Sequence, residues 1–396
     1  MNSNTALSNL KILDFTTLLP GPYATLMLAD MGAEVLKISS PSKFDLVTDG
    51  ETKVEDTNLT AKALWINRNK KSLALNLKTP EGIEIVKKLI LHYDIIIEQF
   101  RPGVMDKLGL SYEKLSKINP KLIYCSITGY GQSGPYKNRA GHDINYLSKS
   151  GLMSHSGRES SGPTLYNTQI ADIAGGSLHS IIGILAAVNY RNLTGCGQYI
   201  DISMLDCIIP LNSLDGTDFL VNSNEPKPEE KLLNGGTFYD FYETRDGRYL
   251  SVGSLEPKFF NLFANAIELP ELINEIKDFK ISRESKEKIK NKIKEKTLSQ
   301  WTNIFKDIDC CVEPVSNLTE ALVEDEQIKS RGVIVEIPIN EADEVRQYAM
   351  PIKFSKTKAQ YNHLGRKVGY DNFEILSSLG YSESEILDLE KRSVFD

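Results

Sequence analysis

A histidine and an aspartate lie about thirty residues apart in a stretch of the chain that is rich in glycine. His142 directly follows Gly141, and Asp172 comes three residues before Gly175. An imidazole and a carboxyl group can each remove a proton and return it when their pKa values lie near the working pH. The pair therefore predicts a site for proton transfer.

His142 lies in a loop that follows a predicted strand. The run Tyr124–Thr128 contains β-branched residues and breaks into Gly129, Gly131 and Gly134. A lone histidine is more often a structural residue, but ligands of open α/β sheets collect outside the carboxyl ends of the strands. A structural and a catalytic interpretation of His142 both stay open on this pattern.

Asp172 also has two interpretations. It precedes a long apolar helix expected from about Ala174 to Arg191, and aspartate is a preferred residue at a helix N-terminus. Gly175 and Gly176 in the first turn cost about 1 kcal/mol each relative to alanine. We expect these glycines to let a ligand approach backbone N–H groups at the positive end of the helix, where a developing oxyanion is stabilised.

The pattern before this stretch alternates strands with helices, which is typical of an α/β domain with a largely parallel sheet. No glycine-rich dinucleotide loop follows the first strand, and no phosphate-binding lysine motif occurs. We therefore predict a large Rossmann-like domain without the usual phosphate loop. Its strands are expected at 10–15, 33–38, 72–77, 95–97, 122–127 and 199–203, with helices at 23–31, 80–92 and 111–118.

The length of 396 residues and a change in composition indicate two domains. We predict a large α/β domain over 1–221, a polar linker over 222–231 and a smaller α+β domain over 232–332. The segment 333–396 is expected to return to the large domain. The charged stretch from Ser282 to Thr297 is interpreted as a solvated helix face.

Composition narrows the classes of partner. A net charge of -7 and a pI of about 5.5 argue against nucleic acid or an anionic membrane as the main partner. The most apolar stretch, Leu178 to Val188, is too short to span a bilayer, and the start shows no signal peptide. The five cysteines lack metal spacing and suit buried thiols in a cytoplasmic protein, so no metal is expected.

Several segments resemble the family III CoA-transferase superfamily (CaiB/BaiF), and specifically its α-methylacyl-CoA racemase branch. The resemblance covers nearly the whole chain. Segments shared with the racemases are 141–146 (Gly-His-Asp-Ile-Asn-Tyr) and 255–259 (Leu-Glu-Pro-Lys-Phe); segments shared more widely are 14–15 with 20–22, 32–35, 67–72, 100–104, 129–132 and 195–198.

The resemblance implies an interlocked homodimer that acts on an acyl-CoA thioester, with no cofactor beyond the CoA of the substrate. It implies that His142 and Asp172 are the acid/base pair and that Glu256 orients the histidine. It places the CoA moiety near Arg68, Lys71, Arg101, Gly141 and Gly175. Inversion of the α-carbon would then proceed by two-base proton transfer through an enolate.

Two departures from the racemase pattern keep a second enzyme class open. The run Tyr166–Ala171 before the aspartate is polar, and Ser39-Ser40 replace a basic residue that often contacts CoA. The alternative is a CoA-transferase in which Asp172 forms an aspartyl-CoA thioester. The glycine-rich loop of formyl-CoA-type transferases is absent around Gly253–Pro257. A non-enzymatic acyl-CoA binding protein is the third interpretation.

Overall fold

The computed structural model describes residues 5–276, 279 and 281–395. Within these residues the chain forms two compact units. The first comprises Met1–Ser150, Thr168–Pro210 and Arg331–Asp396, and the second comprises Gly151–Asn167 and Leu211–Ser330. Segments 151–167 and 211–221, which the sequence assigned to the large domain, cluster with the second unit.

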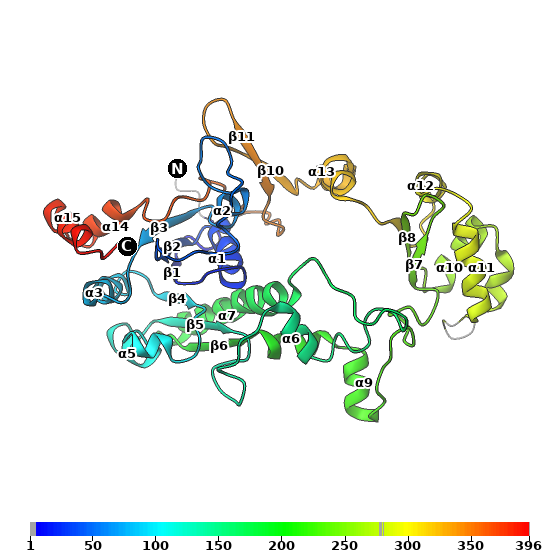
Figure 1. Cartoon of the computed structure of the whole chain (residues 1–396), viewed down its shortest axis with the longest axis horizontal. Coiled ribbons are helices and arrows are strands. Elements are labelled where there is room, and N and C mark those ends of the chain that lie inside the picture. The colour runs from blue at the N-terminus through cyan, green and yellow to red at the C-terminus, as the bar shows by residue number, and fades with distance from the viewer. Residues whose placement is uncertain (1–4, 277–278, 280, 396) are drawn as a thin grey trace. The chain divides into compact units, whose positions relative to one another are not determined.

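The first unit is built on a parallel sheet whose strands, among the described residues, number six (Figure 1). The order β3-β2-β1-β4-β5-β6 is that of the Rossmann fold, and every neighbouring pair is parallel. The predicted α/β class with a parallel sheet is confirmed. The strands are β1 (Lys11–Asp14), β2 (Glu34–Ser39), β3 (Lys70–Ala74), β4 (Ile95–Glu98), β5 (Ile123–Thr128) and β6 (Tyr199–Ser203).

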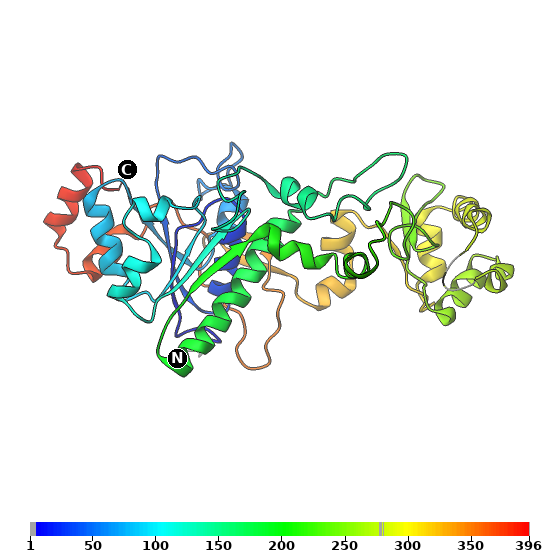
Figure 2. The ribbon, with the colours of Figure 1, turned by 90° about the horizontal axis from the view of Figure 1, so that it is seen from below.

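Helices cover both faces of this sheet, which is why the central strands are buried on both sides. Helix α1 (Pro20–Asp30) contacts β1 and β2, and α7 (His179–Thr194) contacts β5 and β6. Helices α3 (Pro80–Leu89) and α5 (Tyr112–Ile118) join the opposite core, which includes Leu13, Leu36, Ile96 and Tyr124. Figure 2 shows α7 running along the sheet.

The end of the chain covers the outer edge of β3. Helix α14 (Asn372–Ser378) contacts this strand, and α15 (Glu383–Lys391) joins the same core. The side chains of Asp371 and Asn372 accept hydrogen bonds from the backbone N–H groups of Ser72 and Ala74 at 2.7 and 2.8 Å. An edge strand that would otherwise offer unpaired donors is thereby satisfied.

The remaining elements of the first unit are short. A two-stranded antiparallel sheet precedes α14 in the chain. The two helices α14 and α15 stay separate, because Gly380 adopts a φ of 88° between them. The short elements are α2 (Ala61–Ile66), α4 (Val104–Lys107), α6 (Asp143–Lys149), η1 (Ala171–Leu178), α8 (Met204–Ile208), β10 (Ile334–Pro338) and β11 (Glu344–Tyr348), and η2 (Ile209–Leu211) follows α8 where the first unit ends.

The second unit packs helices against an antiparallel sheet in the order β7-β8-β9. Its core is aromatic, and the indole N–H of the buried Trp301 donates to the carbonyl of Ile293 at 2.7 Å. Its elements are α9 (Asp215–Asn222), β7 (Asp240–Glu243), β8 (Tyr249–Val252), α10 (Pro257–Ala266), η3 (Pro270–Asn274), α11 (Arg283–Ile293), α12 (Leu298–Phe305), β9 (Val312–Pro314), η4 (Glu320–Glu324) and α13 (Glu326–Ser330).

The long apolar helix is longer than the sequence indicated. It runs without interruption through η1 and α7, from Ala171 to Thr194, and not from about Ala174 to Arg191. By length and hydropathy these 24 residues meet the criterion for a membrane span. Half of the apolar window is buried inside the unit, and the core helix of a soluble protein meets the same criterion.

Candidate active site

Asp172 lies in the first turn of η1, where the backbone is a π-helix and not an α-helix. Wide π turns are rare and occur often at functional sites. Burial, with the charge of Asp143 beside it, raises the pKa of the Asp172 carboxyl to about 7. This carboxyl forms no hydrogen bond or ion pair within residues 5–276, 279 and 281–395. It is thus a proton donor or acceptor poised near neutral pH.

His142 lies at the N-terminus of α6, outside the helical turn. Its backbone N–H donates to the side chain of Asn145 at 3.0 Å, and its side chain is exposed. The loop before it is held by Tyr146, whose hydroxyl donates to the carbonyl of Gly141 at 2.6 Å. A Cβ on Gly141 would lie 2.7 Å from the Tyr146 ring, so this loop requires glycine there.

Asp143 joins the element that carries His142 to the element that carries Asp172. Its Oδ1 accepts the backbone N–H of Ala171 at 2.6 Å and that of Asp172 at 3.1 Å. These are amides of the first helical turn, which have no partner within their own helix. Asp172 itself is not the capping residue, so that structural interpretation is wrong. The structure thus places the two predicted acid/base residues on adjoining elements of one unit.

The two glycines of η1 serve packing. A Cβ on Gly175 would lie 2.8 Å from Ile208 and 3.0 Å from the carbonyl oxygen of Met204, both on α8. A Cβ on Gly176 would lie 2.8 Å from Pro20 of α1. Both glycines are buried within the helix. Neighbouring helices therefore occupy the space beside both Cα atoms, and the ligand contact expected near Gly175 stays a prediction.

Arg68, expected near the CoA moiety, is buried. It is 1% accessible and forms a two-pronged ion pair with Asp30, at 3.0 and 2.6 Å. Its remaining contacts are a hydrogen bond to Gln347 and the face of Tyr361. Its guanidinium is occupied inside the fold. Lys71 is one-third exposed and pairs with Glu374 at 2.8 Å.

Arg101 is exposed in the loop after β4. It lines a polar cavity of about 260 Å³ at the carboxyl ends of β4 and β5. Glu98 lies in the same cavity, and burial raises the pKa of its carboxyl to about 7. Within the described part of the chain Arg101 forms no ion pair, so its charge is available to an anion.

A larger cavity of about 470 Å³ opens at the carboxyl ends of β1 to β4. This is the position at which the strand order reverses, where Rossmann-type folds bind ligands. Lys37, Lys43 and Lys78 line it together with Phe44 and Phe100. Asp45 and Asp49 also line this cavity. Asp45 accepts a hydrogen bond from the backbone N–H of Leu18, and Asp49 accepts one from the backbone N–H of Asp45.

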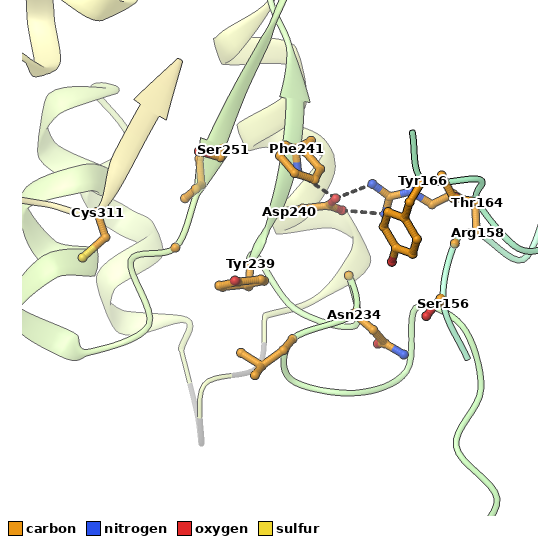
Figure 3. Close-up of a pocket in the computed structure, with 15 residues that line it drawn as sticks. Ser156, Arg158, Thr164, Tyr166, Asn234, Tyr239, Asp240, Phe241, Ser251 and Cys311 are labelled. Carbon is orange, nitrogen blue, oxygen red and sulfur yellow. Dashed lines mark hydrogen bonds and ion pairs between the residues drawn. The ribbon is translucent and has the colours of Figure 1, made fainter. Parts of the chain in front are cut away.

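Glu256 belongs to the second unit, where it precedes α10 and is exposed. This unit has its own cavity of about 460 Å³, lined by Tyr166, Tyr239 and Gly253 among others (Figure 3). Asp240 anchors its wall through ion pairs with Arg158 and Lys286 (not drawn). Tyr166 from the polar run that departs from the racemase pattern thus faces a cavity.

Comparisons with known proteins agree on one family. The model of the family described as CoA-transferase family III matches residues 7–372. The chain belongs to CoA-transferase family III. It is 34% identical to human alpha-methylacyl-CoA racemase over 99% of its own length and 98% of that protein. It is 32% identical to human succinyl-CoA:glutarate CoA-transferase over 100% of its own length and 91% of that protein.

A solved structure supports the same assignment. A CAIB/BAIF family protein from Brucella suis superposes with a TM-score of 0.81 at 28% identity, covering 95% of this chain and 100% of that one. The family III fold is therefore shown by sequence and structure alike. The identities to a racemase and to a transferase are nearly equal and leave the reaction undecided.

Sequence reasoning missed two features of the first unit. Lys43 and Lys78 belong to no sequence motif. The loops that carry them come together at one edge of the sheet only in the folded chain. Asp143 stands beside His142 within a recognised segment, but its contact with amides 28 and 29 residues further on has no local signal.

Proposed function

We propose that this enzyme is a racemase that inverts the α-carbon of 2-methyl-branched acyl-CoA thioesters by two-base proton transfer. The observation that carries the proposal is the Asp172 carboxyl, which has no hydrogen-bond or ion-pair partner among the described residues. Its burial beside Asp143 brings its pKa to about 7, and its helix is joined to the element of His142. One group removes the α-proton to give an enolate, and the other returns a proton from the opposite face.

The pKa of Asp172 favours this reaction over nucleophilic attack. A group that must serve as base for one enantiomer and acid for the other works best with a pKa near the operating pH. A carboxylate nucleophile reacts in its ionised form, and a raised pKa makes that form less abundant at a given pH. The immediate surroundings of Asp172 therefore fit proton transfer better.

We place the CoA moiety at the carboxyl edge of the parallel sheet. Lys43 and Lys78 supply positive charge for phosphate groups, and Phe44 and Phe100 supply apolar surface for the adenine. Arg101 supplies a further cation in the neighbouring polar cavity. These residues take over the function expected of Arg68.

We also propose the interlocked homodimer. Two helices of the single chain expose large apolar side chains, Ile182 and Leu193 on α7 and Leu220 and Val221 on α9. Apolar surface of this kind marks a protein interface. In this arrangement Glu256 of one chain orients His142 of the other.

The test uses one purified acyl-CoA in D₂O with no second acid present. A racemase incorporates deuterium at the α-carbon of (R)- or (S)-2-methylacyl-CoA and produces both epimers. H142A abolishes this exchange while acyl-CoA binding, measured by calorimetry, persists. Exchange that continues unchanged in folded H142A would exclude His142 from the chemistry.

A CoA-transferase is the second candidate, favoured by the near-equal identity to the glutarate transferase. In that reaction the Asp172 carboxylate attacks the thioester carbonyl and expels the CoA thiolate, which gives a mixed anhydride. The thiolate then attacks the Asp172 carbonyl, the first acid leaves as its carboxylate, and an aspartyl-CoA thioester remains. The α-hydrogen stays in place and net product requires an acceptor acid. Acceptor-dependent CoA exchange without α-deuteration, with inactivation by hydroxylamine during turnover, would establish the transferase and reject the racemase.

A further inference from the structure

The carboxylate of Asp143 has an unusual pair of partners. It lies in the first turn of α6, directly after His142, and its Oδ1 accepts both the Ala171 and the Asp172 amides. The two amides belong to the helix that carries the second acid/base group. One oxygen atom therefore fixes the start of η1 against the start of α6.

We propose that Asp143 is a positioning residue of the reaction, whose carboxylate fixes the backbone at Asp172 relative to His142 and supplies the charge that faces the Asp172 carboxyl. The catalytic role of Asp143 in this inference rests on the proposed function. The claim that Asp143 fixes the backbone depends only on the two hydrogen bonds to the Ala171 and Asp172 amides. Asp143 itself need not touch the substrate.

The charge of Asp143 acts on Asp172 without a competing partner among the described residues. Burial is the larger cause of the raised Asp172 pKa, and repulsion by Asp143 is the other. Tyr146 on α6 is a further titratable group that interacts electrostatically with Asp172. Burial is the main cause that raises the pKa of this phenol to about 12, so it stays neutral.

Other titratable groups on the helices packed against η1 have partners of their own and are not causes of the raised Asp172 pKa. His179 of α7 bonds to the carbonyl of Ala174, and Asp30 of α1 pairs with Arg68. Asp206 of α8 acts on Asp201 of β6 and on Cys207. Asp143 is thus the charged group through which the pKa of Asp172 can be changed selectively.

The same two contacts also act on the pKa of Asp143 itself. Burial raises the pKa of its carboxyl, while the Asp172 and Ala171 N–H groups oppose that rise by binding the ionised form. Two carboxyl groups in one site cannot both ionise cheaply. The two amides bind Asp143 and the Asp172 carboxyl has no such donor among the described residues, so the ionised form is favoured by hydrogen bonds only at Asp143.

The experiment is a ¹³C NMR titration of aspartate carboxyl carbons, with the Asp172 signal assigned from D172N. D143N keeps an oxygen that accepts both amides but removes the charge. We expect the Asp172 midpoint to fall from about 7 by roughly one pH unit or more in D143N. D206N removes an exposed carboxylate from α8 and leaves the Asp172 midpoint unchanged.

Activity gives a second readout. The acidic limb of the pH profile of kcat/KM for α-proton exchange moves to lower pH in D143N and stays in place in D206N. A residue with a merely structural role would lower activity without moving this limb. D143E retains the charge, so the Asp172 midpoint in D143E should lie closer to the wild-type value than the midpoint in D143N.

An unchanged Asp172 midpoint in folded D143N overturns the inference. If D143N does not fold, the same question is tested in the wild type. The NMR shifts of the Ala171 and Asp172 amides should then change with pH as the Asp143 carboxyl titrates. Amide shifts that do not change with this titration would also overturn the inference. The NMR result needs no turnover. A shifted midpoint without racemisation would therefore reject the proposed reaction and keep the role of Asp143.

Discussion

At the scale of single residues, the environment that raises the pKa of Asp172 also makes the folded state less stable when this carboxyl is ionised. Its folded pKa of about 7 lies above the ordinary value near 3.8, so the folded chain holds a proton that the unfolded chain releases between these values. The stabilising effect of that proton is complete below the unfolded pKa. It is lost as the pH rises through about 7.

D172N should therefore stabilise the protein above pH 7. The amide keeps the shape of the carboxyl without the cost of a half-buried charge, so we expect a gain of about 1–2 kcal/mol at pH 8. The gain shrinks as the pH falls toward 5. Thermal unfolding of D172N and wild type at both values checks it. Equal melting temperatures at pH 8 would show that Asp172 is not strained by its charge.

Two arginines that look alike in sequence should respond differently to the same change. R68A leaves the buried Asp30 without its partner, and loss of one member of a buried pair costs about 3–5 kcal/mol. R101A removes an exposed cation, so stability stays unchanged while KM for the acyl-CoA rises and kcat is preserved.

Denaturant unfolding and steady-state kinetics on both variants separate these roles. The comparison is matched because each change converts arginine to alanine in the same unit. A fall in kcat with unchanged KM in R101A would count against its contact with CoA.

At the scale of elements, the contact between η1 and α8 explains why a helix start contains glycine. In an open helix G175A would gain about 1 kcal/mol. Here the added Cβ would lie 3.0 Å from a backbone oxygen of Met204, which cannot move without moving α8. We expect a net loss of about 1–3 kcal/mol.

G183A is the matched control in the same helix. Its Cβ would meet only side-chain atoms, the nearest being Ile200 Cγ2 at 3.2 Å, so the change should be nearly neutral. Chemical denaturation of the two variants measures the difference. A G175A variant as stable as G183A would show that the helices are not held by this close approach.

At the scale of the whole molecule, the proposed homodimer divides one active site between two chains. Co-expression of differently tagged H142A and E256Q chains tests this directly. If His142 of one chain works with Glu256 of the other, the purified heterodimer contains one intact and one doubly altered site. It should recover about half of the wild-type kcat per dimer, since the two sites act independently.

Each variant as a homodimer should be nearly inactive. If instead each site were built from a single chain, both sites of the heterodimer would carry one defect, and activity would stay at the level of the homodimers. Analytical ultracentrifugation of the wild type provides the oligomeric state that the test assumes.

The sequence by itself determined the α/β class, because alternating apolar strands and helices are local patterns that survive without knowledge of contacts. Strand β6 was predicted at its observed bounds, and β1, β2, β4 and β5 within one residue at each end. The sequence also singled out His142 and Asp172 as a pair, from residue type and the glycines around them.

Only the tertiary structure decided what these groups contact. Arg68 is held by Asp30 and by Gln347, which lie 38 and 279 positions away, so its burial has no local signature. The hydrogen bond that Asp143 accepts from the Asp172 amide depends on α6 and η1 packing together. Charge and pKa follow from such distant partners, because burial and electrostatic interactions depend on proximity in space and not on order along the chain.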